Sequence, residues 1–419
     1  MRTRGLSAAV LASLLVCARP AAAQVDQERA KAFFEEAQAL CARDAGRLWG
    51  VSVCAPMVVG DMRTRTFATS QPPPETPRPP LVGLTNAPLQ WGGITWGGYI
   101  WDFLVNETPQ IRNEIILHEL FHGVQARLGL AVANPPSEHL DTPEGRYWIR
   151  LEWRALARAL RASGQPRNDA LADALAFRRA RHALFPGADA NERASEIAEG
   201  LAAYTGTVLA SPEAAGALAR TIELLTNGEA GESFVRTFAY MSGPGYGLLL
   251  DASSPDWRRR VRGSDDLAAL LMAALAVQPA ADATASAARY GGPELLAAER
   301  QRAQQREIRL AELRQRFVDG PVLVIRGGGS GMFDSRGAVV IAGSGTVFFN
   351  EFRYSGPPGA LEARSGVLVE SDGGSRRVAA PVRQADGTFA GDGWTFKVAP
   401  GWIVREGPRR GDYEVVQDK

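Results

Sequence analysis

The sequence predicts an α+β protein, in which a mainly helical domain with a small mixed sheet near its N-terminus is followed by an all-β module. Between residues 108 and 226, capping residues and prolines open several segments with apolar residues at helical spacing. Beyond Asp319, short β-prone runs alternate with Gly, Asp-Gly and Pro-Gly turns. We therefore expect a helical domain over 24–290, a long helical connector over 291–318 and a β-rich module over 319–419.

The N-terminal residues have the pattern of a secretory signal peptide. Two arginines precede an apolar run over residues 6–17, and an alanine triplet at 21–23 offers a cleavage site. The apolar run is too short to anchor the chain in a bilayer. Cys17 would indicate a lipoprotein, but Val16 precedes it where lipoprotein signals carry a small residue. We expect a signal peptide over 1–23 and an exported protein, periplasmic or secreted, with neither lipid anchor nor membrane span.

Composition and cysteine content narrow the class of protein further. The 419 residues include 47 Lys and Arg against 46 Asp and Glu. The chain therefore lacks the excess of positive charge that is typical of nucleic-acid-binding proteins. Cys41 and Cys54 remain once the signal peptide is removed. In an exported protein such a pair predicts a disulfide that closes a short loop. Two buried free thiols are the alternative.

The first hundred residues predict a helix followed by strands. Residues 26–43 have the spacing of an amphipathic helix, and 51–59 and 64–69 read as two strands around a turn. Six prolines within 71–80 predict a surface loop. The stretch 81–105 is rich in Trp, Gly, Ile and Tyr, which predicts one or two strands leading into the next helix.

That next helix carries the most informative motif in the chain. The pair Thr108-Pro109 predicts a helix start, and apolar residues at helical spacing predict a buried helix through 116–125. His118 and His122 are four residues apart, so their imidazoles point the same way, as two ligands of one metal must. Glu119 flanks them as a base for the metal-bound water, completing the H-E-x-x-H pattern of zinc hydrolases. Histidines satisfied by hydrogen bonds alone are the alternative.

Further capping residues predict four helices over 142–161, 168–182, 191–209 and 211–226. Shorter helices are expected over 231–275. The long connector before the β-rich module is charged along its length, and the module itself contains no His and no Cys. We therefore expect no catalytic constellation in the β-rich module.

A catalytic zinc takes three protein ligands and keeps one position for water. A histidine six residues after His122 is absent, because position 128 is Leu. His139 and His182 are better explained as surface or structural residues. A carboxylate from the predicted helix over 191–209 is therefore the better candidate for the third ligand.

Three glutamates lie on one face of that helix, within an arc of about 60°. Glu199 lies in an otherwise nearly uncharged run over 197–208, where a carboxylate needs a positive partner. Glu192 and Glu196 are then candidates for hydrogen bonds to a ligand histidine. A solvated face with three glutamates is the alternative, and Glu144 and Glu152 are rival ligands.

The combination of HELFH with EGLAAY at 199–204 resembles the gluzincin zinc peptidases, and EGLAAY is similar to the E-G-F-A-x-Y element of gluzincin aminopeptidases. The region 45–260 is also similar to a group of exported bacterial HExxH proteins. The resemblance implies that His118, His122 and Glu199 bind zinc and that Glu119 is the general base. Two differences are that position 203 is Ala, where thermolysin-like enzymes have Asp, and that no G-A-M-E-N-type element is present.

Gluzincins often stabilise the oxyanion with a Tyr or a His. Tyr246 follows a Gly-Pro-Gly sequence that would expose its hydroxyl at a turn, and Tyr240 and Tyr204 are alternatives. The stretch 96–103 is a candidate edge strand for binding an extended substrate, with core packing as the alternative.

The predicted function is that of an exported zinc-dependent peptidase acting on a peptide or protein. One alternative is a non-catalytic envelope protein that has a structural metal site and a β-module binding a partner. Another is hydrolysis of a different amide, such as a cell-wall peptide. The sequence does not identify the partner of the β-module.

Overall fold

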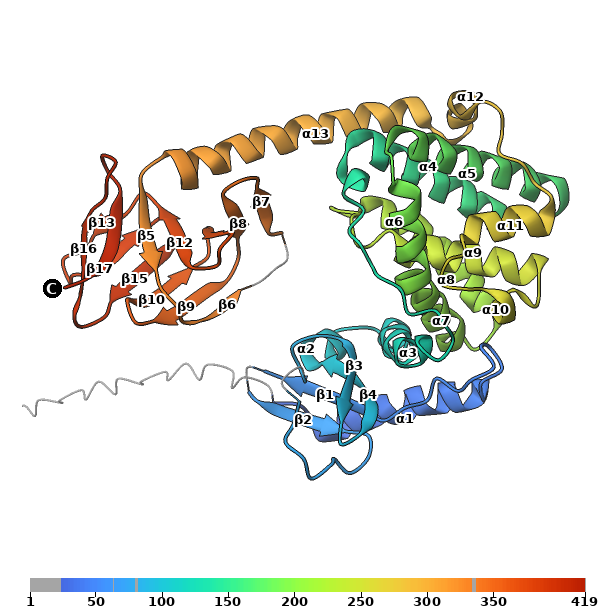
Figure 1. Ribbon diagram of the computed structural model, residues 1–419, viewed down its shortest axis with the longest axis horizontal. Coiled ribbons are helices and arrows are strands. Elements are labelled where there is room, and N and C mark those ends of the chain that lie inside the picture. Colours follow the sequence, from blue (N-terminus) through green and yellow to red (C-terminus); the bar gives the residue numbers. More distant parts are fainter. Residues whose placement is uncertain (1–23, 63, 80–81, 334–336, 419) are drawn as a thin grey trace, which may run out of the picture. The chain divides into compact units, whose positions relative to one another are not determined.

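The structure is a computed structural model that describes residues 24–62, 64–79, 82–333 and 337–418. The chain divides into two units between Glu299 and Arg300 (Figure 1). Helices account for 48% and strands for 20% of the structure, and most strands lie in the C-terminal unit. The predicted α+β class is therefore confirmed. The predicted signal peptide lies outside the described residues.

The N-terminal unit contains a four-stranded sheet, ordered β2-β1-β4-β3. Its strands are β1 (Met57–Asp61), β2 (Thr66–Thr69), β3 (Ala87–Trp91) and β4 (Ile94–Ile100). Strand β1 is parallel to β4, and the other pairings are antiparallel, so the sheet is mixed as predicted.

Strand β4 is not an edge strand, which corrects one expectation for the stretch 96–103. It pairs with β1 on one side and with β3 on the other, so its backbone is not available to a substrate. Trp96 and Tyr99 are fully buried, which is the core-packing alternative. The residues after β4 form the short helix α2 (Trp101–Val105).

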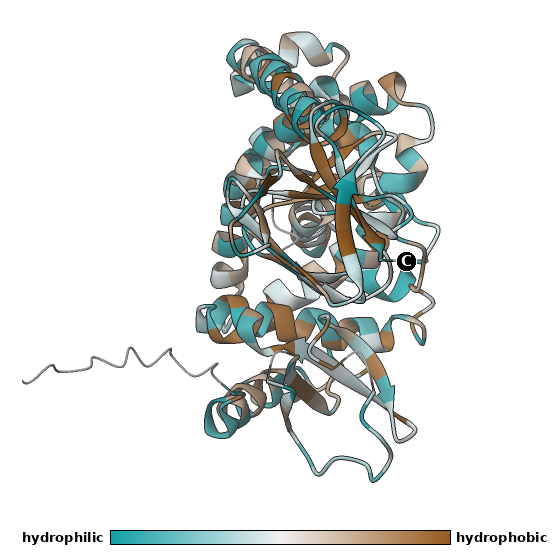
Figure 2. Cartoon of the chain, turned by 90° about the vertical axis from the view of Figure 1, so that its left-hand side faces the viewer, coloured by the Kyte–Doolittle hydropathy of each residue, from teal (hydrophilic) through white to brown (hydrophobic). Residues whose placement is uncertain are grey.

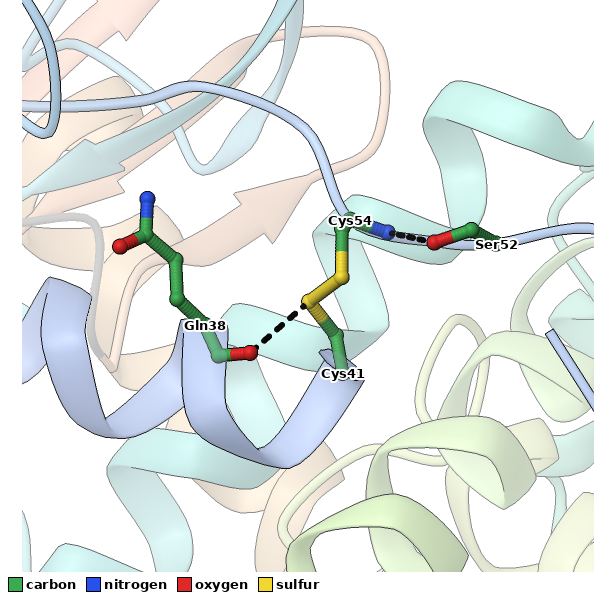
Figure 3. The surroundings of a disulfide bond; sticks show 4 residues. All are labelled: Gln38, Cys41, Ser52 and Cys54. Atoms are coloured by element: carbon green, nitrogen blue, oxygen red, sulfur yellow. Dashed lines mark hydrogen bonds between the residues drawn. A yellow bond between two sulfur atoms is a disulfide. The ribbon is translucent and has the colours of Figure 1, made fainter. Parts of the chain in front are cut away.

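Helix α1 (Gln27–Asp44) is joined by a disulfide to the segment that leads into β1 (Figure 3). Cys41 and Cys54 have Cα atoms 5.5 Å apart and are separated by 13 residues. The predicted disulfide is therefore present. Closing a loop of this length stabilises a fold by about 3 kcal/mol in the chain-entropy model. Beside it, the Cys54 amide donates a hydrogen bond of 3.2 Å to Ser52 Oγ.

Helix α3 (Pro109–Gln125) begins as predicted, because Thr108 Oγ1 accepts a hydrogen bond of 3.3 Å from the Ile111 amide. The helix contacts β3 and β4 and also packs against α7 (Leu201–Ala210). At Gly206 on α7 a Cβ atom would lie 2.5 Å from the Glu114 carbonyl oxygen. Glycine therefore allows the close approach of α7 to α3.

Most of the other helices of this unit share one hydrophobic core with α1 and α3. Helix α4 packs along α5, and α9 packs against α7. Among the described residues, none of these helices has the length and apolar character that crossing a bilayer requires. The elements are η1 (Glu138–Asp141), α4 (Pro143–Leu160), α5 (Gly164–Leu184), α6 (Ala188–Ser195), η2 (Glu196–Gly200), α8 (Ala214–Asn227), η3 (Gly228–Ala230), α9 (Ala239–Ser253), α10 (Trp257–Arg260), α11 (Leu267–Leu275), α12 (Ala283–Ala287) and η4 (Ala288–Tyr290).

The predicted helix over 191–209 is interrupted. Element η2 is a π-helical turn between α6 and α7, in which the Leu201 amide bonds to the Glu196 carbonyl. A π turn holds one more residue than an α-helical turn, and such turns are frequent at functional sites. Glu199 lies within it.

Helix α13 (Gly292–Arg314) contains the division between the units and is followed by a second π turn, η5 (Gln315–Asp319). Two sheets then enclose a core that includes Leu323, Leu361 and Phe396. Figure 2 shows stretches of hydrophobic residues on these strands. The first sheet contains β6 (Ser330–Phe333), β9 (Phe352–Gly356), β10 (Gly359–Ala363), β13 (Val382–Arg383), β14 (Phe389–Gly391) and β15 (Trp394–Val398). The second contains β5 (Val322–Arg326), β7 (Val339–Ile341), β8 (Gly345–Phe348), β11 (Val367–Glu370), β12 (Ser375–Ala379), β16 (Trp402–Glu406) and β17 (Tyr413–Gln417).

Candidate metal centre

Helix α3 carries His118, Glu119 and His122, and the two histidines lie on the same face of the helix, as their spacing of four residues predicts. The Nε2 atoms of His118 and His122 lie 2.9 Å apart, and the two rings are nearly perpendicular, at 81°. Glu119 lies next to them and is 9% exposed. Tyr99 of β4 donates a hydrogen bond of 3.0 Å to the Ile116 carbonyl, which ties this part of α3 to the sheet.

Glu199 reaches the two histidines from the π turn η2. Its Oε2 atom lies 3.3 Å from His118 Nε2 and 3.4 Å from His122 Nε2. The ligand atoms of these three residues all lie within 4.8 Å of one another. The other carboxylate oxygen accepts a hydrogen bond of 3.0 Å from Asn134 Nδ2, and Asn134 Oδ1 accepts one of 2.8 Å from Ser195 Oγ. The structure therefore brings the three predicted ligands together.

A zinc ion fits this set of donors. His122 Nδ1 donates to Gln125 Oε1 at 2.7 Å, so the neutral imidazole keeps a lone pair on Nε2, the atom that faces His118 and Glu199. The Gln125 amide nitrogen donates to backbone carbonyls, which fixes the orientation of the amide. Two imidazole nitrogens and one carboxylate oxygen form a known ligand set of catalytic zinc, with one position left for water.

Burial and neighbouring charges set the protonation of these groups. Burial raises the pKa of Glu119 to about 7, and the Glu199 carboxylate adds to this effect while His122 opposes it. Burial also lowers the pKa of His118. Although burial acts in the same direction on His122, contacts with Glu199 and Glu119 raise its pKa above 6.5. Burial would raise the pKa of Glu199, but hydrogen bonds from both histidines lower it, so this carboxylate is ionised.

A cavity of about 530 Å³ lies beside His118 and Glu119 and has mainly apolar walls. Two of its charged residues neutralise each other, because Arg220 Nε lies 2.9 Å from Glu114 Oε1, and the carboxyl groups of Glu107 and Glu119 also line it. Its mainly apolar walls can accept an uncharged side chain next to the candidate metal centre. Its lining residues are Thr85, Asn86, Phe103, Glu107, Ile111, Glu114, Ile115, His118, Glu119, Ala203, Thr207, Arg220, Leu224 and Tyr240.

Tyr240, in the first turn of α9, is the tyrosine that reaches this site. Its ring stacks on His118 with centroids 5.2 Å apart and planes at 10°. Its hydroxyl donates to Glu199 Oε2 at 2.9 Å, and the side chain lines the cavity while 38% exposed. Burial and the Glu199 carboxylate raise the pKa of Tyr240, so the hydroxyl keeps its proton and remains a donor.

Tyr246, the expected oxyanion donor, lies elsewhere. It is fully buried and donates a hydrogen bond of 2.7 Å to Glu152. The sequence Gly243-Pro244-Gly245 is part of α9 and not an exposed turn. A Cβ atom at Gly243 would lie 2.2 Å from the Gly200 carbonyl oxygen, so these residues allow α9 to pack closely on η2. The expectation for Tyr246 is corrected: of the tyrosines considered, Tyr240 is the one that lies at the site.

Glu192 and Glu196 do not hydrogen-bond to the ligand histidines, which corrects a second expectation. Arg181 binds both oxygens of Glu192, at 2.7 and 2.6 Å, and Arg178 binds both oxygens of Glu196, at 2.8 and 2.7 Å. Because of the π turn, the Glu199 side chain points toward His118 and His122, whereas those of Glu192 and Glu196 point toward the arginines. These four residues and Glu152, all almost fully buried, form what we name the buried charge cluster.

The other residues considered as the third ligand make contacts elsewhere or are exposed. Glu152 belongs to the buried charge cluster, and Glu144 is exposed at the start of α4. His139 and His182 hydrogen-bond to Glu192, at 2.7 and 2.9 Å, and therefore have structural roles. Tyr204, the remaining alternative to Tyr246, donates to Asp251 at 2.7 Å within the core.

Comparisons of the chain with protein-family models, curated proteins and solved structures found no match. The resemblance to gluzincins therefore depends on the motif residues and on their geometry. Two residues of the site were missed by the sequence analysis. Gln125 lies three residues after His122 on the same helix face, which is a usable signal. Asn134 lies in the loop between α3 and η1, where no pattern distinguishes it.

Proposed function

We propose that this protein is a zinc-dependent peptidase of gluzincin type that hydrolyses peptide bonds. The proposal is carried by the convergence of His118, His122 and Glu199, with Glu119 beside them at the cavity. The mainly apolar cavity favours substrates with an uncharged, apolar side chain next to the cleaved bond. The Cys41–Cys54 disulfide supports action outside the cytoplasm, since such bonds persist in oxidising compartments.

In this mechanism His118, His122 and Glu199 hold the metal, and Glu119 handles the proton. Bound zinc supplies Lewis acidity, which lowers the pKa of water and polarises the peptide carbonyl. Glu119 accepts the proton of the attacking water as the new C–O bond forms. It then delivers that proton to the amine nitrogen as the C–N bond breaks. The Tyr240 hydroxyl, which donates to Glu199 Oε2 in this structure, would turn its proton to the oxygen that gains negative charge.

Metal removal tests the proposal. We expect the purified full chain to contain close to one zinc ion, and a broad peptide library to be cleaved. Treatment with a chelator should abolish cleavage, and added zinc should restore it. Metal analysis and mass spectrometry of the digest measure both effects. The variant His182→Gln serves as a histidine control outside the site and should retain its zinc.

Two outcomes of this experiment contradict the proposal. Wild-type protein without stoichiometric zinc would exclude both a peptidase and a structural metal site. Stoichiometric zinc without cleavage of any peptide would favour the non-catalytic envelope protein with a partner-binding β-module.

The variant Tyr240→Phe tests the oxyanion donor. We expect kcat to fall by about 10²-fold, since one donor to the oxyanion is lost. Zinc affinity should stay within a few-fold, because the ring and its stacking on His118 remain. Steady-state kinetics and a chelator competition measure the two quantities. A fall in zinc affinity with unchanged turnover of the loaded enzyme would show that Tyr240 only orients Glu199.

Tyr246→Phe is the matched control for Tyr240→Phe. It removes a buried hydroxyl from Glu152 and should lower the stability of the fold without changing kcat.

A further inference from the structure

Gln125 is a buried residue that contacts both segments carrying the candidate ligands, helix α3 with the two histidines and the π turn η2 with Glu199. It lies at the end of α3 and is 6% exposed. Its Oε1 atom accepts the hydrogen bond of 2.7 Å from His122 Nδ1. Its Nε2 atom donates to the carbonyls of Ala198, at 2.7 Å, and Ile197, at 3.3 Å. The amide thus connects one ligand histidine to the two residues that precede Glu199.

The π turn makes part of this connection possible. In an α-helix the Leu201 amide would bond to the Ile197 carbonyl, four residues earlier. Here it bonds to the Glu196 carbonyl, five residues earlier. The Ile197 carbonyl accepts from Gln125 instead. The same extra residue that rotates Glu199 toward the histidines therefore exposes a carbonyl to Gln125.

The orientation of the Gln125 amide is determined by its partners. Rotating the amide by 180° would place its oxygen against the Ala198 and Ile197 carbonyls, which are acceptors only. It would also place the NH₂ group against Nδ1 of His122. With the observed orientation, the proton of a neutral His122 is held on Nδ1, and Nε2 is left to bind a metal.

From these contacts we infer that Gln125 is a positioning residue that couples the two ligand-bearing helices. It holds His122 with Nε2 directed at the centre, and it holds the η2 backbone so that Glu199 reaches the same point. The inference rests on the proposed zinc site and adds a residue that does not itself bind zinc. Hydrogen-bond partners of ligand histidines change metal affinity by about 10- to 100-fold when removed.

Two variants of the full chain test this role. Gln125→Met keeps the length of the side chain and removes all three hydrogen bonds. Gln125→Asn keeps an amide that is too short to reach His122 and the carbonyls together. We expect each to weaken zinc binding by about 10- to 100-fold in a chelator competition. We also expect a changed visible spectrum of the cobalt(II)-substituted protein, because the ligand geometry alters.

Gln110→Met is the matched control, since Gln110 lies on the same helix and its side-chain amide donates to Glu114 Oε1, at 2.8 Å, rather than to a residue of the candidate metal centre. It should retain the wild-type zinc affinity and cobalt spectrum. Circular dichroism is used to check that each variant is folded. A folded Gln125→Met or Gln125→Asn protein with wild-type affinity and spectrum would overturn the inference while the zinc peptidase proposal stands. Wild-type protein that fails to bind zinc overturns both.

Discussion

Replacing Glu119 by glutamine should lower peptide hydrolysis by about 10²- to 10⁴-fold while the zinc content stays close to one ion per chain. Glutamine has the same shape as the carboxylate but cannot accept a proton from water. The metal should be retained because His118, His122 and Glu199 form the ligand set without Glu119. Cleavage of a quenched peptide substrate and metal analysis of the same preparation measure the two results.

A second carboxylate at the same cavity supplies the control for Glu119→Gln. Glu107 lines the cavity but is not among the residues that converge on the candidate metal centre. Glu107→Gln removes one negative charge from the cavity and should change hydrolysis only a few-fold. Equal losses in both variants would mean that the charge of the cavity matters and that Glu119 is not the base. Retained hydrolysis in Glu119→Gln would place the base on another residue.

The second large effect is expected at Glu192, within the buried charge cluster. Glu192→Gln should destabilise the N-terminal unit by about 3–5 kcal/mol, because Arg181 loses a carboxylate that binds it through two hydrogen bonds. Hydrogen bonds from His139 and His182 to the same carboxylate would also be weakened. Urea unfolding at neutral pH measures the change. Glu75→Gln, in the exposed proline-rich loop, should change stability by less than about 0.5 kcal/mol.

The effect of Glu192→Gln should depend on pH in one direction. Although burial would raise the pKa of Glu192, Arg181 and the two histidines hold it well below its ordinary value of 4.5. A carboxyl group whose pKa is lowered by folding stabilises the fold above its unfolded pKa and loses this contribution as the pH falls. The stability difference between wild type and variant should thus be full above pH 4.5 and shrink below it. A difference that grew in acid would contradict this account.

Local patterns predicted the parts of the site that depend on one helix. The start of α3 follows from Thr108 and Pro109, and the alignment of His118 with His122 follows from the helical period. The Cys41–Cys54 disulfide followed from the cysteine count and the predicted export. In each case the determining residues are close in sequence.

The features that the sequence did not predict depend on contacts between segments that are distant in the sequence. Nothing in Glu196-Ile197-Ala198-Glu199-Gly200 distinguishes a π turn from an α-helix. Gly243-Pro244-Gly245 resembles a turn, yet packing of Gly243 on Gly200 keeps it within α9 and so brings Tyr240 to the site.

In the β-rich module, too, some strands could be predicted from the sequence and others could not. The β-prone runs beyond Asp319 form strands, as at β15 (Trp394–Val398). The hairpin of β9 and β10 was not predicted, because Pro357 and Pro358 mark a turn but β10 consists largely of Gly, Ala and Glu, which have weak β preference. Pairing with neighbouring strands decides such segments.

The extra residue in η2 also has a genetic consequence. Deleting a single codon within the turn would restore an uninterrupted helix and turn the acid at 199 away from the imidazoles. Glu192 precedes the turn and Glu196 is its first residue, so both would keep their arginine partners. Under the proposed function, loss of the third zinc ligand and survival of the scaffold are one small mutational step apart, and we expect inactive descendants to persist as stable folds.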